Sequence, residues 1–224
     1  MPLVERVLAG LEATCPPLRF VPRMDPMDEL VSCILSQHAA DVVTFPTFAS
    51  LKMRYEDWDT IAALSPAELA NMIRPVGLAN QKAKSILSVL AQIKSKFGTF
   101  DLSALYDQSL WPTDKALVWL ESLEGVGPKT ASIVMCFAFG RHTVPVDTHV
   151  QRVSLRLGLI PPKATARAAH VLLSTLVPEG LAYRFHVALI EHGRATCTAR
   201  SPACPRCELR SFCPRIGLEP RVPT

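Results

Sequence analysis

The chain has 224 residues, of which 49% are hydrophobic and 20% charged, so it has enough apolar material to build a core and is not a disordered chain. Its longest apolar run, Ile133 to Phe139, is far shorter than the roughly 20 residues that cross a bilayer. Because Glu5 and Glu12 lie where an export signal would be apolar, we expect a cytoplasmic protein with no membrane partner. The formal net charge is +4, and the whole excess of positive charge comes from residues 181–224, which contain seven arginines and three glutamates. This distribution is a weak indication of nucleic-acid binding.

The first half of the chain has helix signals at three places. The pair Asp25-Pro26 predicts a helix start, because Asp caps the free amides and Pro fits the first turn. Residues 65–68 read Ser-Pro-Ala-Glu, a capping box whose helix is expected to end at Gly77. Asn80 opens a third helix, which Gly98 ends.

Further helical patterns cover the second half, and alternating apolar and polar residues are hardly seen. These patterns run over 114–123, 128–139, 148–157, 165–176 and 181–192. The sequence therefore predicts an all-α protein.

The segment from Leu120 to Ala131 reads LESLEGVGPKTA and predicts two helices joined by a tight turn. Gly125 and Gly127 permit the turn, and Pro128 begins the second helix. The free amides at the start of that helix form a site for a phosphate group, so the turn can hold a nucleic acid without reading its bases. A plain packing unit of two helices explains the glycines equally well.

Lys129 favours the functional interpretation of this turn. It lies one residue into the new helix, beside the positive end of the helix dipole, which disfavours the charged amine and favours the nucleophilic free form. An exposed lysine with its charge in water is the common alternative. Eighteen residues further on, Asp147 opens another helix, where an isolated Asp is usually only an N-cap.

The seven cysteines are unevenly spread. Three stand singly in apolar helical patterns, where a thiol usually packs as a small hydrophobe: Cys15, Cys33 and Cys136. The other four lie within 17 residues: Cys197, Cys204, Cys207 and Cys213. The odd total and the clustering argue against a disulfide framework. Four thiolates bind either zinc or an iron–sulfur cluster, although zinc sites usually use two close pairs and only one is present.

Three motifs in this order, LEGVGPKTA, VPVDTHVQR and C-x6-C-x2-C-x5-C, resemble the endonuclease III branch of the helix–hairpin–helix DNA glycosylases. The resemblance runs from about Asp28 to Cys213. It implies two α-helical domains flanking a DNA-binding cleft: a six-helix barrel with the hairpin over 23–141, and an iron–sulfur domain over 1–22 and 142–224. It also implies that the four clustered cysteines hold a 4Fe-4S cluster, with scaffolding as its expected role.

The same resemblance implies a base-excision-repair DNA glycosylase with AP lyase activity, acting as a monomer on duplex DNA of the bacterial nucleoid that contains a damaged base or an abasic site. Lys129 would attack the sugar of an oxidised pyrimidine of the thymine glycol type, and Asp147 would take a proton or stabilise charge on the sugar. The resulting Schiff base would lead by β-elimination to a break 3′ to the lesion. A glycosylase for mismatched or alkylated bases and a non-catalytic iron–sulfur DNA-binding module remain the alternatives.

DNA contacts also follow from the resemblance. Gln37 or His38 would fill the gap left by the extruded base, and the sequence does not decide between them. Leu78 would wedge between bases of the opposite strand. The hairpin glycines, Gly125 and Gly127, would contact the backbone, and His149 would also contact DNA.

Two departures from the family pattern leave the substrate range open. Pro128 stands where many members have a basic residue. The segment 102–113, with Tyr106 and Trp111, makes the chain about a dozen residues longer here than compact members, and we expect it to shape the approach to the cleft.

Overall fold

The computed structural model describes residues 2–13 and 19–218, so Cys15 lies outside the described residues. Every regular element in these ranges is helical, which confirms the all-α prediction. The α-helices are α1 (Leu3–Glu12), α2 (Pro26–Ser36), α3 (Asp41–Arg54), α4 (Trp58–Ala62), α5 (Pro66–Met72), α6 (Ala79–Phe97), α7 (Thr113–Glu121), α8 (Pro128–Phe137), α9 (Thr148–Arg156), α10 (Ala166–Leu176) and α11 (Ala182–Ala195). Three short 3-10 helices are η1 (Arg74–Val76), η2 (Ser103–Tyr106) and η3 (Cys204–Arg206).

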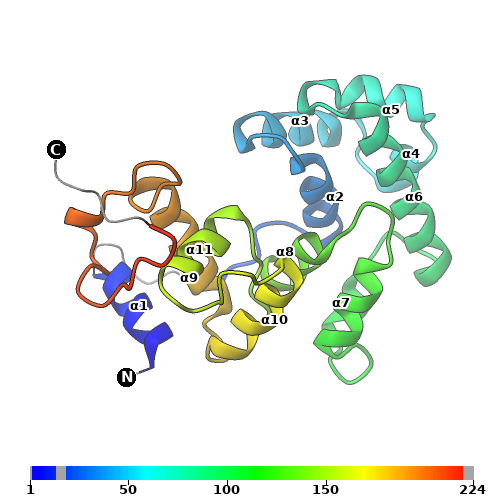
Figure 1. Ribbon diagram of the computed structural model, residues 1–224. Coiled ribbons are helices and arrows are strands. Elements are labelled where there is room, and N and C mark those ends of the chain that lie inside the picture. Colours follow the sequence, from blue (N-terminus) through cyan, green and yellow to red (C-terminus); the bar gives the residue numbers. More distant parts are fainter. Residues whose placement is uncertain (1, 14–18, 219–224) are drawn as a thin grey trace. The chain divides into compact units, whose positions relative to one another are not determined.

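The chain forms two compact units (Figure 1). The first, Pro22–Arg141, contains the glycine turn and is called the hairpin unit below. The second combines Met1–Val21 with His142–Thr224 and is called the cysteine unit. No helix in the described ranges has both the length and the apolar character that a membrane span requires.

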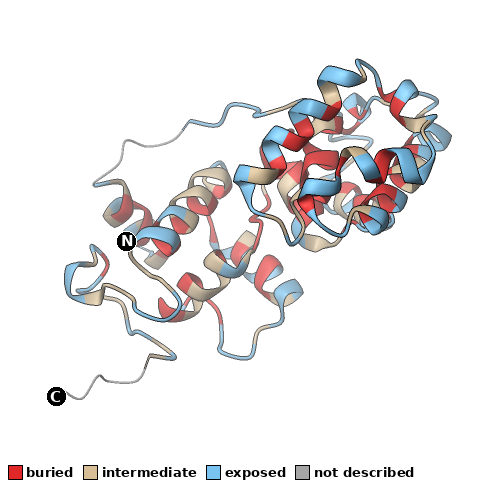
Figure 2. Ribbon diagram, turned by 90° about the horizontal axis from the view of Figure 1, so that it is seen from above, coloured by how far each residue is buried: buried red, intermediate tan, exposed pale blue. Residues whose placement is uncertain are grey.

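Helix α2 is the centre of the hairpin unit and packs against α3, α6 and α8. Nine of its eleven residues are buried, and the helix faces that point inward around it are buried as well (Figure 2). One of the nine is Glu29, whose carboxylate forms an ion pair with Arg23. A buried carboxylate needs such a partner, because an unpaired charge in an apolar interior is strongly unfavourable.

The predicted helix starts are confirmed in the hairpin unit. The Asp25 side chain accepts a hydrogen bond of 2.9 Å from the Met27 amide, and α2 begins at Pro26. Ser65 and Glu68 form both bonds of the capping box. That helix is shorter than predicted, because α5 ends at Met72 and a 3-10 turn fills the chain before Gly77.

The segment 102–113 is tied to the hairpin unit by a buried arginine. Arg141 donates through Nη2 to the carbonyl oxygens of Leu105 at 2.6 Å, Tyr106 at 3.3 Å and Trp111 at 3.4 Å. The Trp111 ring also packs on Phe97, with ring centroids 5.9 Å apart. The segment is therefore a packed part of the unit.

In the cysteine unit, α11 packs along α9 and also contacts α1 (Figure 1). Arg184 on α11 and Glu12 on α1 form an ion pair of 2.6 Å. Gly10 on α1 lies so close to Leu209 that a Cβ at position 10 would stand 2.7 Å from the leucine Cδ2. Helix α1 therefore packs directly on the loop that carries the clustered cysteines.

Candidate functional site

The glycine turn joins two helices, α7 and α8, as the sequence predicts. Its two glycines have different structural roles. Gly125 has a φ of +79°, and a Cβ there would stand 2.8 Å from Ser85 Oγ, so backbone and packing both require glycine. Gly127 has an extended φ of −100° and precedes α8 as its N-cap. A Cβ on Gly127 would have no atom within 4 Å. The turn is therefore open on the side of Gly127, beside the free amides of α8.

Lys129 is exposed in the first turn of α8, next to those amides. The buried thiol of Cys33, on α2, lies close enough to feel the charge of Lys129. Burial raises the pKa of the Cys33 thiol well above its ordinary value, Glu29 raises it further, and the charges of Arg23 and Lys129 oppose the shift. Lys129 is thus exposed to solvent, and its positive charge still lowers the pKa of a thiol on the buried face of α2.

Asp147 belongs to the other unit and is the N-cap of α9. Its Oδ1 accepts a hydrogen bond of 2.7 Å from the Val150 amide, and the side chain is half-buried. The N-cap interpretation of this aspartate is therefore correct, and it uses only Oδ1 of the carboxylate.

Three histidine contacts hold the short segment that leads into Asp147: His142 within the segment reaches out to α10, and His170 and His186 reach in from α10 and α11. His142 Nε2 lies 2.8 Å from the Ser174 carbonyl oxygen. His170 Nδ1 lies 3.0 Å from the carbonyl oxygen of Val144, and His186 Nδ1 lies 2.8 Å from that of Pro145. The backbone before Asp147 is held from α10 and α11, which fixes the position of its carboxylate within the cysteine unit.

The residues predicted to enter DNA lie on strained loops of the hairpin unit. His38 has a φ of +54° and Leu78 a φ of +51°, and Arg215 is the only other described non-glycine residue with a positive φ. This conformation is unfavourable for side chains with a Cβ, and such strain gathers at functional sites. Both side chains are exposed, Leu78 to 55%.

Gln37 differs from its neighbour His38. Its side-chain amide donates a hydrogen bond of 2.8 Å to the carbonyl oxygen of Gly125 in the hairpin. Gln37 therefore connects the end of α2 with the glycine turn, and the side chain that faces solvent is that of His38.

His149, the remaining predicted DNA contact, is half-buried on α9. Its Nδ1 lies 3.1 Å from Arg152 Nη2, and its Cβ stands 3.0 Å from where a Cβ on Gly193 would be. The side chain is thus packed between α9 and α11, and its contact with DNA stays a prediction.

The four clustered cysteines line one pocket of the cysteine unit: Cys197, Cys204, Cys207 and Cys213. The pocket has about 350 Å³ of empty space, part of it open to solvent. Burial raises the pKa values of Cys207 and Cys213, and the charges of neighbouring cysteines raise them further. Four thiolates so close together repel one another unless cations neutralise them, so the donor set fits an iron–sulfur cluster.

Two arginines of α9 bind the loop that carries Cys197, and sequence reasoning missed both. Arg156 donates through Nη1 to Cys197 Sγ at 3.2 Å and to the Thr198 carbonyl at 2.7 Å, and through Nη2 to the Ala199 carbonyl at 3.0 Å. Arg152 donates through Nε to the Cys197 carbonyl at 3.0 Å. Asp147 caps the N-terminus of the same helix. Helix α9 therefore positions the candidate catalytic carboxylate at its start and also carries the two arginines that bind the cysteine loop.

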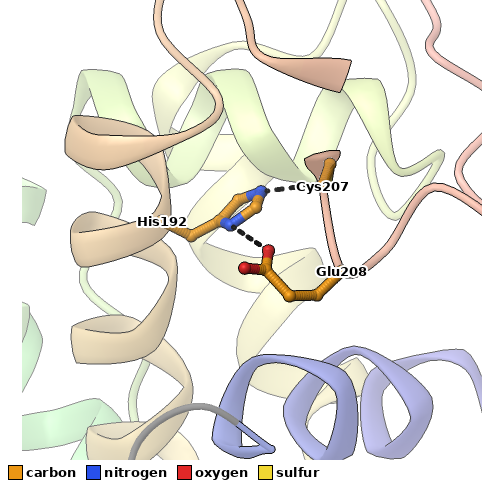
Figure 3. A group of neighbouring side chains, drawn as sticks. All are labelled: His192, Cys207 and Glu208. Carbon is orange, nitrogen blue, oxygen red and sulfur yellow. Dashed lines mark hydrogen bonds and ion pairs between the residues drawn. The ribbon is translucent and has the colours of Figure 1, made fainter. Parts of the chain in front are cut away.

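A buried histidine also contacts the cysteine set (Figure 3). His192 Nε2 lies 3.7 Å from Cys207 Sγ, and its Nδ1 lies 3.8 Å from Glu208 Oε2. Burial lowers the pKa of His192, and Glu208 partly opposes that effect. These three residues place their ligand atoms within 4.8 Å of one another. Because Cys207 already shares its pocket with three further thiols, we interpret His192 as a hydrogen-bond partner of Cys207 rather than as a ligand.

Exposed positive charge surrounds the cysteine loop. Five of the seven C-terminal arginines are exposed: Arg194 near the end of α11, and Arg200, Arg206, Arg210 and Arg215 around the loop. Arg184 is paired with Glu12, and Arg221 lies outside the described residues. Arginines placed in this way suit a phosphate backbone.

Two parts of the chain match known protein families. Residues 31–179 match the HhH-GPD superfamily of base excision DNA repair proteins, and residues 197–213 match the iron–sulfur binding domain of endonuclease III. The endonuclease III of Rickettsia conorii is 35% identical over 82% of this chain and 81% of its own length. A putative DNA glycosylase of Arabidopsis thaliana is 31% identical over 86% of this chain and 66% of its own length.

A solved structure of a trapped endonuclease III–DNA covalent intermediate is also similar, with a TM-score of 0.80 and 29% identity over 94% of this chain and 93% of that one. The resemblance inferred from the three motifs and the prediction of a 4Fe-4S cluster are both confirmed. The chain belongs to the endonuclease III family, within the HhH-GPD superfamily of base excision DNA repair proteins.

Proposed function

We propose that this member of the family is a bifunctional DNA glycosylase and AP lyase that removes oxidised pyrimidines of the thymine glycol type from duplex DNA. The observation that carries the proposal is the solvent-exposed amine of Lys129, one residue inside α8 and directly after a turn with free backbone amides. A phosphate bound at those amides brings the adjoining sugar to the amine.

In the proposed reaction, the extruded nucleotide presents C1′ to Lys129. The Nζ lone pair forms a bond to C1′, and the glycosidic bond breaks with its electron pair leaving on the base, which takes up a proton. The C1′–O4′ bond then breaks as the nitrogen lone pair forms a C=N bond, O4′ takes up a proton released by the amine, and the resulting imine acidifies C2′. Loss of a C2′ proton then expels the 3′ phosphate, which breaks the strand 3′ to the lesion.

Asp147 assists this step as a carboxylate, by taking the amine proton or by stabilising positive charge on the sugar. Support comes from its position: His170 and His186 hold the segment before it, that segment's own His142 contacts Ser174, and the N-cap bond of Asp147 uses Oδ1 alone.

His38 and Leu78 are proposed to enter the duplex, His38 at the gap left by the extruded base and Leu78 on the opposite strand. Their exposure and positive φ values support these roles. Gly125 and Gly127 shape the phosphate site. The barrel and cluster-domain roles of the two units, the monomeric state and the cytoplasmic, nucleoid-associated location stay predictions.

The four clustered cysteines are proposed as the ligands of the 4Fe-4S cluster, which would supply a rigid support to the surrounding loop when it is bound. Arg152, Arg156 and His192 hold the sulfur-bearing loop in place. None of these residues takes part in bond breaking.

The test is borohydride trapping on duplex DNA with one thymine glycol, because borohydride reduces a protein–sugar imine to a permanent link. Wild type should form a covalent adduct, and Lys129→Gln should form none. Lys84→Gln, which changes an exposed lysine on α6, is the matched control and should trap as wild type does.

The other outcomes are equally informative. Trapping on an abasic site but not on thymine glycol would support the lyase activity and would indicate that the enzyme removes mismatched or alkylated bases instead. No adduct on either substrate, from protein whose cluster is intact, rejects Lys129 as nucleophile and favours a DNA-binding module.

A further inference from the structure

Lys82 on α6 is a lysine whose side chain lies inside the hairpin unit, with 3% of the residue exposed. Its Nζ donates one hydrogen bond of 2.8 Å to the carbonyl oxygen of Leu35 and one of 2.9 Å to that of Val76. Both partners are uncharged backbone groups, and burial lowers the pKa of this ammonium. Placing a lysine here is unfavourable unless the two bonds are needed, since a well-packed apolar residue has no such desolvation cost.

The two carbonyls belong to the two loops that carry the strained residues. Leu35 lies in the last turn of α2, three residues before His38. Val76 ends the 3-10 turn η1, two residues before Leu78. Carbonyls at the end of a helix have no partner within it and attract a cation. One ammonium group therefore bonds to the backbone just ahead of both positive-φ positions.

These positions need such external support. A left-handed conformation is unfavourable for any residue with a Cβ and persists only where the surroundings hold it. Neither side chain supplies that hold by its own burial, because His38 and Leu78 are both exposed. The neighbouring backbone must therefore restrain them, and Lys82 binds the backbone just before each of the two positions.

We propose that Lys82 is a positioning residue that fixes the spacing between the two DNA-inserting loops, so that His38 and Leu78 enter the duplex together. The inference rests on the proposed function, because it needs both residues to act at an extruded nucleotide. It adds a residue that touches neither DNA nor the reacting atoms.

The experiment compares two abasic substrates that differ only in the need for insertion. Duplex abasic DNA must be opened by both loops, whereas a single-stranded abasic oligonucleotide has no partner strand to separate. We expect Lys82→Met to lower kcat/KM for strand cleavage on the duplex by about tenfold or more and to leave single-strand cleavage within about twofold of wild type. Lys84→Met, which removes one exposed charge from the same helix, should match wild type on both.

A purely structural role for Lys82 gives a different pattern. If Lys82→Met loses duplex and single-strand cleavage in equal proportion, or loses neither, the proposal is overturned. If wild type cleaves neither substrate, the proposed lyase function fails, and this inference falls with it. Lys82→Gln keeps a short donor and serves where the methionine variant does not fold, with a smaller loss again confined to the duplex.

A double-mutant cycle provides an independent test of the mechanism. If Lys82 acts through the loops, Lys82→Met should cause no further loss of duplex cleavage in a protein that already carries His38→Ala and Leu78→Ala. A general folding defect would instead lower activity by the same factor in both backgrounds, and that result would refute the positioning role.

Discussion

The side-chain amide of Gln37 donates a hydrogen bond of 2.8 Å to the carbonyl oxygen of Gly125, although 88 residues separate the two. This bond joins the end of α2 to the glycine turn before α8. It also separates two neighbouring side chains that the sequence leaves equivalent: Gln37 is engaged with the hairpin, and His38 faces solvent. His38 is therefore the better candidate for the gap left by an extruded base.

The first prediction compares these neighbours. His38→Gly removes the side chain that is proposed to enter the duplex and relieves a positive φ, so it should lower duplex cleavage about tenfold while leaving the free energy of unfolding equal to wild type or about 0.5 kcal/mol higher. Gln37→Ala removes the bond to Gly125 and should lower the free energy of unfolding by about 1 kcal/mol. Urea unfolding and steady-state cleavage of abasic duplex DNA check both. The reverse pattern would assign the insertion to Gln37.

The second prediction separates the capping role of Asp147 from its chemical role. Asn caps helices as well as Asp does, so Asp147→Asn should keep the stability of wild type, whereas Asp147→Ala should lose about 1 kcal/mol. Both variants lack the carboxylate and should lose base release by about a hundredfold or more. Single-turnover release of thymine glycol measures this loss. Near-normal release by Asp147→Asn would reduce Asp147 to a structural cap.

The third prediction uses the different surroundings of the two hairpin glycines. Gly125→Ala meets both a positive φ and Ser85, and it should lower the free energy of unfolding by about 1–3 kcal/mol. Gly127→Ala has open space for its Cβ and should fold as wild type does. The new methyl group lies where a phosphate is proposed to approach, so duplex affinity should fall about tenfold. Unchanged affinity, measured by fluorescence anisotropy at fixed salt, would mean that the phosphate binds elsewhere.

The fourth prediction concerns retention of the iron–sulfur cluster. Arg156 contacts the Cys197 loop through several donors of one planar fork, a geometry that a lysine does not reproduce. Arg156→Lys should lose the visible absorbance of the cluster in air about tenfold faster than wild type. Arg206→Lys changes an exposed arginine of the same loop and should behave as wild type. Equal rates in all three proteins would show that Arg156 does not support the cluster.

The fifth prediction follows from a buried thiol in the hairpin unit. Burial raises the pKa of Cys136 to about 12, and Glu29 adds to the shift. Between the ordinary thiol pKa of about 9 and this value, the unfolded chain binds fewer protons than the native one, so stability falls as pH rises. The slope from this one group is at most about 1.4 kcal/mol per pH unit, and Cys136→Val should flatten the curve.

Tryptophan fluorescence is a suitable probe for that curve, because Trp58, Trp111 and Trp119 all belong to the hairpin unit. Urea unfolding of wild type and Cys136→Val between about pH 8 and about pH 11 gives the two slopes. Deprotonation of tyrosines and lysines affects both proteins alike. Identical slopes would contradict the native pKa of about 12.

The features that sequence predicted well are those set by neighbouring residues. Asp25 and Ser65 cap their helices through bonds to amides two and three positions away, so their patterns are visible locally. No helix was predicted over Asp41–Arg54, a stretch that contains Pro46, a residue unfavourable inside a helix. In the structure α3 runs through Pro46 and packs against α2, so tertiary packing overrides the local signal.

The residues of the candidate site also fall into two groups, those that the sequence predicts and those that only the folded structure reveals. Its motif residues, Lys129 and the four cysteines, are recognisable because their spacing along the chain is characteristic. Lys82 and Arg156 were missed because each has a distant partner, the Leu35 carbonyl 47 residues from Lys82 and the Cys197 sulfur 41 residues from Arg156. No residue type signals in advance that a carbonyl will need a donor, so such supports emerge only from the folded structure.

The packing of α1 on α11 and on Leu209 has a consequence for how the protein is made. The ribosome synthesises α1 long before these partners, because the whole of Pro22–Arg141 lies between them in the chain. The four clustered cysteines come still later. Iron–sulfur loading and the complete docking of α1 therefore both belong to a late stage of biogenesis, and a ribosome stalled before Cys197 would carry all of the hairpin unit but none of the four clustered cysteines.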